Sequence, residues 1–345
     1  MSKKAKIIVS CSASVVILVV VLWLAQCVLM PKYMSDIPEG ALIGEYYASA
    51  GGHDVLFVGD CEVYENFSPV TLWEEHGVSS YIRGSAQQLI WQSYYMLEEM
   101  LEYEMPQVVV YNVLAMKYGT PQSEAYNRLN LDGMKMSSYK MAAVHASMTD
   151  GESALSYVFP LLRYHSRWSE IGAEDFQYMF SRDSVSFAGC LMQTGVRGID
   201  PASIPAAVPL ENYELPALCW GYLDRMRQLC EEHGVRLVLI KAPSLYPHWY
   251  DEWDAQVTEY AGRHGLNYYN LLKISDDIGI DWSCDTYDMG LHLNVDGAEK
   301  LSAYFGGVLR EECGVTDRRG DDAYTSRWDE ISRSYYNEKE SRKNK

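Results

Sequence analysis

The chain has 345 residues, of which 48% are hydrophobic and 22% are charged, an ordinary composition for a globular protein with a full core. Its 47 acidic residues outnumber its 29 basic residues, which gives a formal net charge of -18. This negative charge disfavours nonspecific binding to nucleic acids and to anionic surfaces, so we expect no nucleic-acid partner.

The N-terminus carries a long apolar segment. Residues 7–30 contain no charged side chain, and a helix needs roughly 20 apolar residues to cross a bilayer. Lys3, Lys4 and Lys6 precede this segment, and the positive-inside rule leaves such a flank in the cytoplasm. We therefore expect residues 1–6 to be cytoplasmic, one transmembrane helix over 7–30, and everything that follows to lie outside the cytoplasm.

Two other uses of this segment compete with a membrane anchor. A cleaved signal peptide has an apolar region of about 7 to 15 residues and a small-x-small cleavage site, and neither feature is present. The stretch LAQC, which ends at Cys27, resembles a lipoprotein box, but Gln26 stands where a small residue is expected. The pattern favours the anchor in the cell membrane.

After a linker over 31–53, apolar runs alternate with segments of helical spacing. Such alternation predicts an α/β domain with a parallel sheet, helices on both faces, and ligands beyond the carboxyl ends of the strands. The expected strands are 54–60, 79–84, 107–113, 236–242 and 267–272. The expected helices are 87–104, 217–234, 251–265 and 295–312.

Two further regions interrupt or follow this alternation. Residues 114–215 are too long for a simple loop, which indicates a cap or subdomain inserted into the domain. Residues 313–345 form a charged tail that we expect to end in a frayed helix. Six of the eight cysteines lie outside the anchor, and this even number permits disulfides.

Three pieces of sequence fall at the expected ligand-binding edge: GDCEVYENFSP from Gly59, RGSAQQ from Arg83 and DTYDMGLHLNV from Asp285. Together they resemble the SGNH, or GDSL-like, hydrolase superfamily over residues 54–312, apart from the insertion. The resemblance implies a flavodoxin-like three-layer α/β/α fold. Cys61 stands where the family has its nucleophilic serine. An aspartate precedes His292 by four positions rather than three, so either Asp288 or Asp285 can be its partner.

The resemblance also implies the roles of individual residues. Cys61 would attack as a thiolate, His292 would carry the proton, and Asp288 would orient the imidazole. A helix N-terminus or a neighbouring histidine lowers the pKa of a thiol, and we expect both effects at Cys61. The backbone amides of Cys61 and Gly84 and the side chain of Asn112 would form the oxyanion hole. We expect neither a metal nor another cofactor.

A small basic cluster lies within the insertion. Arg163, His165 and Arg167 follow one another closely in a strongly acidic protein, so they could bind an anionic substrate group. The alternative is a surface on which these side chains form salt bridges.

Within the superfamily, the chain most resembles anchored extracytoplasmic proteins of bacterial envelopes, including those of teichoic acid D-alanylation and alginate O-acetylation. The resemblance implies an acyl esterase or O-acyltransferase that acts through Cys61 on a cell-surface glycan, beside a membrane-bound O-acyltransferase. The alternative is a catalytically silent domain that binds glycan or such a partner. A thiol-based redox protein is disfavoured, because the sequence contains no C-x-x-C pair.

Overall fold

The computed structural model describes residues 2–31, 39–180 and 184–344. Residues 32–38 of the predicted linker and 181–183 of the predicted insertion lie outside the described residues.

The centre of the protein is a five-stranded sheet in which all strands are parallel. The strand order is β2-β1-β3-β4-β5. Each of the five predicted strands is confirmed, with ends shifted by one or two residues. The strands are β1 (Val55–Gly59), β2 (Ser80–Gly84), β3 (Val108–Asn112), β4 (Arg236–Lys241) and β5 (Asn267–Asn270).

Helices cover both faces of the sheet, as the alternating pattern predicts. Alternate residues of a strand point to opposite faces, so Leu56 and Val58 of β1 join one core cluster, whereas Val55 and Phe57 join the other. The first cluster is closed by helices α5, α11 and α12, and the second by α4 and α14. These helices are α4 (Pro69–His76), α5 (Ile90–Met100), α11 (Ala217–Glu232), α12 (Asp251–His264) and α14 (Val295–Glu311).

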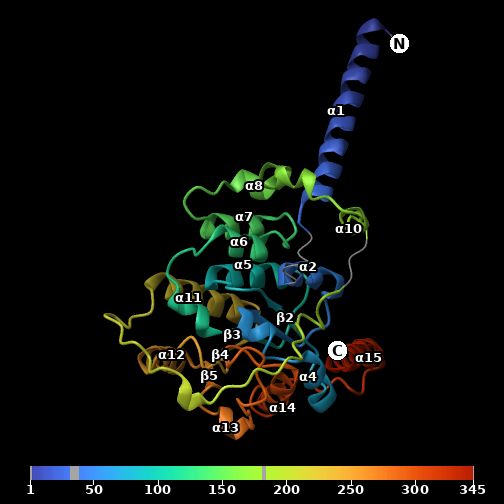
Figure 1. The fold of residues 1–345 in the computed structure, drawn as a ribbon. Helices are drawn as coiled ribbons and strands as arrows, with labels where there is room; N and C mark the ends of the chain where they lie inside the picture. Colours follow the sequence, from blue (N-terminus) through green and yellow to red (C-terminus); the bar gives the residue numbers. More distant parts are fainter. Residues whose placement is uncertain (1, 32–38, 181–183, 345) are drawn as a thin grey trace.

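The N-terminal helix α1 (Lys3–Leu29) projects away from the domain (Figure 1). It is long and apolar enough to cross a membrane, and Leu29 is its one buried residue. Helix α2 (Glu39–Ser49) then returns the chain to the domain and packs against β2 and α6 (Glu124–Leu131). An exposed apolar helix of this length requires an apolar environment of its own.

The predicted insertion is not a single compact cap. Its first half contains α6 and α7 (Ser138–Ser147), which share a small apolar cluster with Ile43 of α2 and Met96 of α5. Farther along, the backbone carbonyl of Ala188 accepts a hydrogen bond from the N–H of Ile82 in β2, so the second half runs beside the sheet. The other short helices are α8 (Ala154–Val158), α9 (Leu161–Tyr164), η2 (His165–Ser169), α10 (Ala173–Gln177) and η3 (Pro201–Ser203).

The C-terminal segment forms a helix, as expected of the predicted tail. Helix α15 (Asp322–Lys343) buries Trp328 and Tyr335 against the domain. The indole of Trp328 stacks on that of Trp73 in α4, with ring centroids 5.6 Å apart. Trp328 and Tyr335 therefore fix α15 to the domain, although its charged composition is that of a solvent-exposed helix. The remaining helical elements are α3 (Cys61–Tyr64), η1 (Val113–Lys117) and α13 (Ser275–Ile278).

Candidate active site

The carboxyl ends of the central strands meet at one edge of the sheet, where parallel α/β folds bind ligands. β1 ends immediately before Asp60 and Cys61, β2 ends at Gly84, and β3 ends at Asn112. The loop that contains Asp288 and His292 precedes α14 and joins this edge: the backbone N–H of Leu293 donates to Oδ1 of Asn66, 2.9 Å away, just after α3. The predicted catalytic blocks therefore come together in space.

Cys61 is the first residue of α3, a helix of four residues. The side chain of Asp60 caps this helix by accepting the N–H of Glu62 over 3.2 Å. Cys61 as a whole is half-buried, while protein atoms surround its thiol group. Burial raises the pKa of the Cys61 thiol to about 11, although His292 acts to lower it. The expected low pKa is thus wrong, because desolvation outweighs the charge of the histidine and the helix is a single turn.

Asp288 is the residue that orients His292. Its Oδ2 lies 2.7 Å from Nδ1 of the imidazole, and its Oδ1 accepts the backbone N–H of His292 over 2.8 Å. Asp285, the alternative partner, instead accepts hydrogen bonds from Lys300, at 2.6 Å, and from the backbone of Asp281. The geometry therefore selects Asp288 over Asp285.

A second carboxylate at this histidine was not predicted. Oε2 of Glu65 lies 3.0 Å from Nδ1 of His292, and the hydroxyl of Tyr287 donates to the same oxygen over 2.6 Å. Both residues stand inside the quoted motifs, and Glu65 is four positions after Cys61. In a helix, this spacing places the Cys61 and Glu65 side chains on the same face, one turn apart. It is the sequence feature that could have predicted Glu65 at the site.

The charge of His292 follows from these neighbours. Burial acts to lower the pKa of the imidazole, but the Asp288 hydrogen bond, the Cys61 thiol and the Glu65 carboxylate together raise it to about 12. His292 is only 7% exposed. Its Nε2 atom is buried and makes no hydrogen bond of good geometry within the described residues. An imidazolium whose Nδ1 side is fully occupied can act only through Nε2, toward Cys61 or a substrate.

The predicted oxyanion donors fare differently. A Cβ on Gly84 would lie 2.8 Å from the carbonyl oxygen of Gly59 and 2.9 Å from Val63, so the glycine lets β2 approach the Cys61 turn closely. Asn112, in contrast, donates to Asp60 at 3.0 Å and to Glu62 at 2.9 Å. Because its amide hydrogens are already used, Asn112 is not available as an oxyanion donor, and that prediction is wrong.

A buried ion pair lies beneath the Cys61 turn. Nζ of Lys241, at the end of β4, lies 2.8 Å from Oε1 of Glu62, and both side chains are at most 1% exposed. Ser244 and Asn112 donate to the two oxygens of the same carboxylate. The strand ends are thus tied to the residue that follows Cys61. Asp60 lies in the same network, and burial beside Glu62 raises its pKa to about 6.

Lys117 is a cation near this edge that the sequence analysis did not single out. It ends η1, directly after β3, and its Nζ lies over the ring of Tyr118, 5.1 Å from the centroid. Burial lowers its pKa, against the attraction of Glu62 and Asp60. Within the described residues it forms no ion pair at salt-bridge distance, which leaves its charge available to a ligand.

The basic cluster of the insertion lies elsewhere and is paired. Arg163 lies 2.7 Å from Glu124, and Arg167 lies 3.3 Å from Asp175 and donates to the carbonyl of Leu29 in α1 over 2.7 Å. The predicted anion site at Arg163, His165 and Arg167 is therefore corrected to the salt-bridged alternative, at the foot of α1. The cluster therefore belongs to the part of the fold that contacts α1, and no described contact links it to the Cys61 site.

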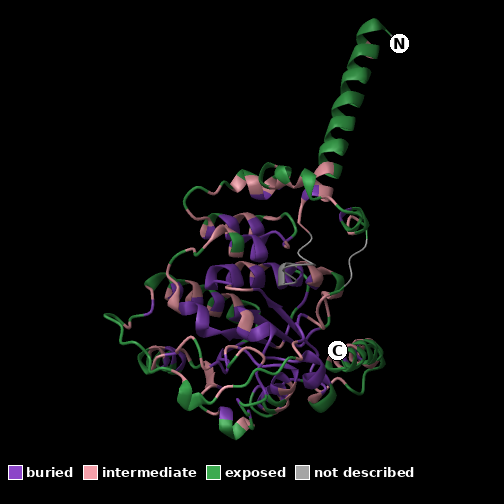
Figure 2. Cartoon of the chain, viewed as in Figure 1, coloured by how far each residue is buried: buried purple, intermediate pink, exposed green. Residues whose placement is uncertain are grey.

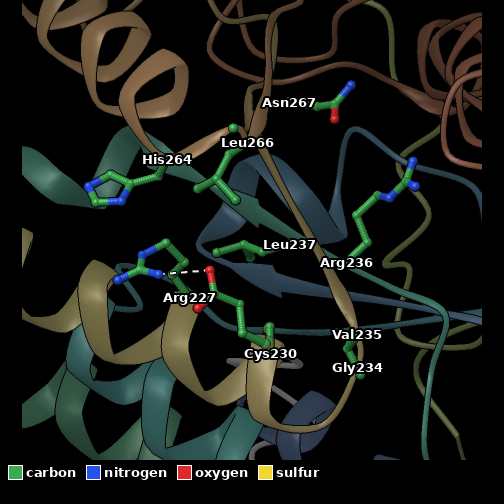
Figure 3. Close-up of a pocket in the computed structure, with 11 residues that line it drawn as sticks. Arg227, Cys230, Gly234, Val235, Arg236, Leu237, His264, Leu266 and Asn267 are labelled. Carbon is green, nitrogen blue, oxygen red and sulfur yellow. Dashed lines mark hydrogen bonds and ion pairs between the residues drawn. The ribbon is translucent and has the colours of Figure 1, made fainter.

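A depression at the opposite end of the sheet does not offer comparable chemistry (Figure 3). It lies where β4 and β5 begin, and Arg227 pairs there with Glu231 at 2.7 Å. Burial raises the pKa of its one thiol, Cys230, to about 12. The site of interest is the carboxyl edge.

Metal-binding atoms are also gathered at His292. One ligand atom each from Glu65, Asp288 and His292 lies within 4.8 Å of the others. Asp288 is hydrogen-bonded to His292 and Glu65 forms an ion pair with it, so the arrangement fits a histidine held by two carboxylates.

The cysteines outside α1 form no disulfide within the described part of the chain, so Cys61 and Cys284 both carry thiols. No model of a known protein family matches the sequence, and no curated protein is significantly similar to it.

Proposed function

We propose that this protein is a membrane-anchored, extracytoplasmic acyltransferase or acyl esterase of the SGNH type, with Cys61 as its nucleophile. The observation that carries the proposal is a half-buried thiol at a strand end whose pKa, raised by burial, is acted on in the lowering direction by a neighbouring histidine, His292, which Asp288 in turn holds at 2.7 Å. A nucleophile, a base and an orienting carboxylate are the parts that covalent acyl transfer requires.

The fold supports the SGNH assignment. The strand order β2-β1-β3-β4-β5 in a parallel sheet covered on both faces is that of flavodoxin-like proteins. The nucleophile follows the first strand and the histidine precedes the last helix of the sheet domain, in the order that the superfamily uses. The fold alone does not define an activity, so the proposal depends on the site.

The reactive form in the proposed cycle is the thiolate–imidazolium pair of Cys61 and His292, which forms when the Cys61 thiol, whose pKa is raised, releases its proton to water. Sγ bonds to the acyl carbon of a donor ester, the carbon–oxygen bond breaks, and Nε2 of His292 gives its proton to the leaving oxygen. A hydroxyl of the acceptor then loses its proton to Nε2 and attacks the thioester, which restores the thiolate–imidazolium pair. With water as acceptor the same steps hydrolyse the ester. The backbone amides of Cys61 and Gly84 are the proposed donors to the carbonyl oxygen.

The proposed location follows from α1. Lys3, Lys4 and Lys6 precede the apolar helix, which supports a cytoplasmic N-terminus and a domain on the outer side. In that location the acceptor is a hydroxyl of a cell-envelope glycan, and the acyl group is delivered through a membrane-bound O-acyltransferase. Lys117 follows β3 and has no salt-bridge partner within the described residues, which supports a donor or acceptor that carries a negative group.

A silent binding domain is the second candidate, and two observations favour it. The high pKa of Cys61 disfavours the thiolate at neutral pH, and Asn112 lacks a free donor for an oxyanion. In this role the Cys61 edge would hold glycan or a membrane partner without turnover.

Intact-mass analysis of the full chain in detergent, incubated with small activated acyl esters, distinguishes the two candidates. We expect one acyl adduct, mapped to Cys61 by peptide analysis, which is absent in Cys61→Ala and strongly reduced in His292→Ala. Cys284→Ala is the matched control, because that exposed thiol can react without catalysis. An adduct that forms equally on Cys61 with and without His292, or none on Cys61 at all, would leave the binding domain as the function.

A further inference from the structure

A strip of short helices lies beside the foot of α1. It consists of α8, α9, η2 and α10, between Ala154 and Gln177, and ends at Phe180. Helices α9, η2 and α10 all contact α1. In Figure 1 the strip runs across the top of the domain, at the level where α1 leaves it.

The strip exposes several bulky apolar side chains, beside charged ones such as Arg163 and Glu170. Trp168 is 74% exposed and Phe180 is 87% exposed. The other exposed apolar side chains of the strip are Leu155, Phe159, Leu162 and Phe176. Figure 2 shows the strip as largely exposed or intermediate. Six bulky apolar side chains exposed within one short segment are more than the single exposed apolar residues of an ordinary surface, and such a grouping marks a contact with a membrane or another molecule.

The inner side of the strip is firmly attached to the domain. Tyr157 is fully buried, and the guanidinium of Arg128 lies 3.6 Å from its ring centroid. The hydroxyl of Tyr164 donates to Asp132 over 2.8 Å. One side of the strip therefore packs on the domain and the other exposes apolar side chains, as expected of a segment that lies at a membrane interface.

The chain itself determines the depth of the strip. A spanning helix leaves the hydrocarbon near its last apolar residues, which in α1 are Val28 and Leu29. Arg167 donates to the carbonyl of Leu29 over 2.7 Å, so η2 is fixed to this point. Trp168 is the next residue, and tryptophan is enriched where a bilayer meets water. The exit point of α1 and the apolar face of the strip thus lie at one level.

We propose that the strip lies in the outer interface of the same bilayer that α1 spans, with Trp168, Phe180 and their apolar neighbours inserted among the lipid headgroups and upper acyl chains. This inference rests on the proposed anchoring by α1. A helix and an embedded strip hold the domain at two places, whereas a helix alone leaves it free to swing. The domain would therefore present the Cys61 edge at a fixed height above the membrane.

Tryptophan fluorescence of the full chain in zwitterionic liposomes tests the proposal. Quenching is measured with lipids brominated either near the headgroup or near the bilayer centre. The contribution of one tryptophan is the difference between wild type and its phenylalanine variant. We expect the Trp168 signal to be quenched mainly by the shallow bromines, and that of Trp23 in α1 mainly by the deep ones. Trp220→Phe is the control, because Trp220 lies on α11, away from α1.

The outcomes separate the two claims. If Trp23 is quenched by the deep bromines and Trp168 by neither lipid, α1 spans the bilayer but the strip faces water or a partner protein, and the inference is overturned. If Trp23 is not quenched by the deep bromines, the anchor itself fails, and the interfacial strip fails with it. Quenching of Trp220 equal to that of Trp168 would also overturn the inference, because the effect would not be local to the strip.

Discussion

Asp288 contacts His292 twice. Its Oδ1 accepts the backbone N–H of His292 over 2.8 Å, and its Oδ2 lies 2.7 Å from Nδ1 of the imidazole. The four-residue spacing permits both contacts because the chain turns between them: Met289 and Gly290 have φ values of 68° and 89°. The turn brings the carboxylate back over the residue that it orients. The four-residue spacing therefore keeps Asp288 in contact with His292.

The first prediction concerns the two carboxylates at His292. Asp288→Asn should lower acyl transfer by about 10²- to 10⁴-fold, because a misoriented imidazole cannot deliver the proton. Glu65→Gln should cost less, since Asp288 still holds the ring at the shorter distance. Asp285→Asn is the control and should retain activity, because Asp285 pairs with Lys300. Steady-state rates on a chromogenic ester measure all three. Equal losses in Asp285→Asn and Asp288→Asn would contradict the assignment.

The second prediction concerns pH. The pKa of Cys61 is raised to about 11, so its thiol is protonated at neutral pH and deprotonates as the pH rises. Since the thiolate is the reactive form, alkylation of Cys61 should accelerate about tenfold per pH unit between about pH 7 and about pH 10. His292→Gln should slow the reaction further, because the group that lowers this pKa is gone. Peptide mass mapping after timed alkylation follows the rate, and a plateau below about pH 8 would show an activated thiolate instead.

The third prediction concerns Gly84. An added methyl group meets the backbone of Gly59 at 2.8 Å, and backbone cannot move aside cheaply. Gly84→Ala should destabilise the protein by about 1–3 kcal/mol. Gly221→Ala, within α11, has nothing within 4 Å of the new Cβ and should stabilise the protein by about 0.5–1 kcal/mol. Denaturant midpoints of both variants give the comparison. A neutral Gly84→Ala would mean that the turn after β1 is not packed against β2.

The fourth prediction concerns the buried pair of Glu62 and Lys241. Lys241→Met leaves the Glu62 carboxylate buried without its cation, which should cost about 3–5 kcal/mol. Adding Glu62→Gln removes the unpaired charge and should recover part of that loss. Unfolding free energies of the single and double variants measure the coupling. A double variant no more stable than Lys241→Met would contradict the view that the unpaired carboxylate causes the loss.

The sheet could be predicted from local sequence because buried parallel strands are short apolar runs. DVLFVGD and QVVVYNV contain such runs, and both became central strands, β1 and β3. The pairing of Cys61 with His292 was reached through motif order, since both blocks flank the edge where strands end. Asn112 was assigned wrongly because the sequence gives its position at a strand end but not the two carboxylates that occupy its amide.

Local sequence by itself determined the five strands, the apolar helix α1 and the order of the chemical blocks, because each depends on neighbouring residues along the chain. Only the tertiary structure decided that Glu65 also reaches His292, how far burial raises the pKa of Cys61, and that α15 packs through Trp328. These features depend on residues far apart in the sequence that approach within a few ångströms. Desolvation and hydrogen bonding depend on such short distances in space, which the spacing of these residues along the chain does not reveal.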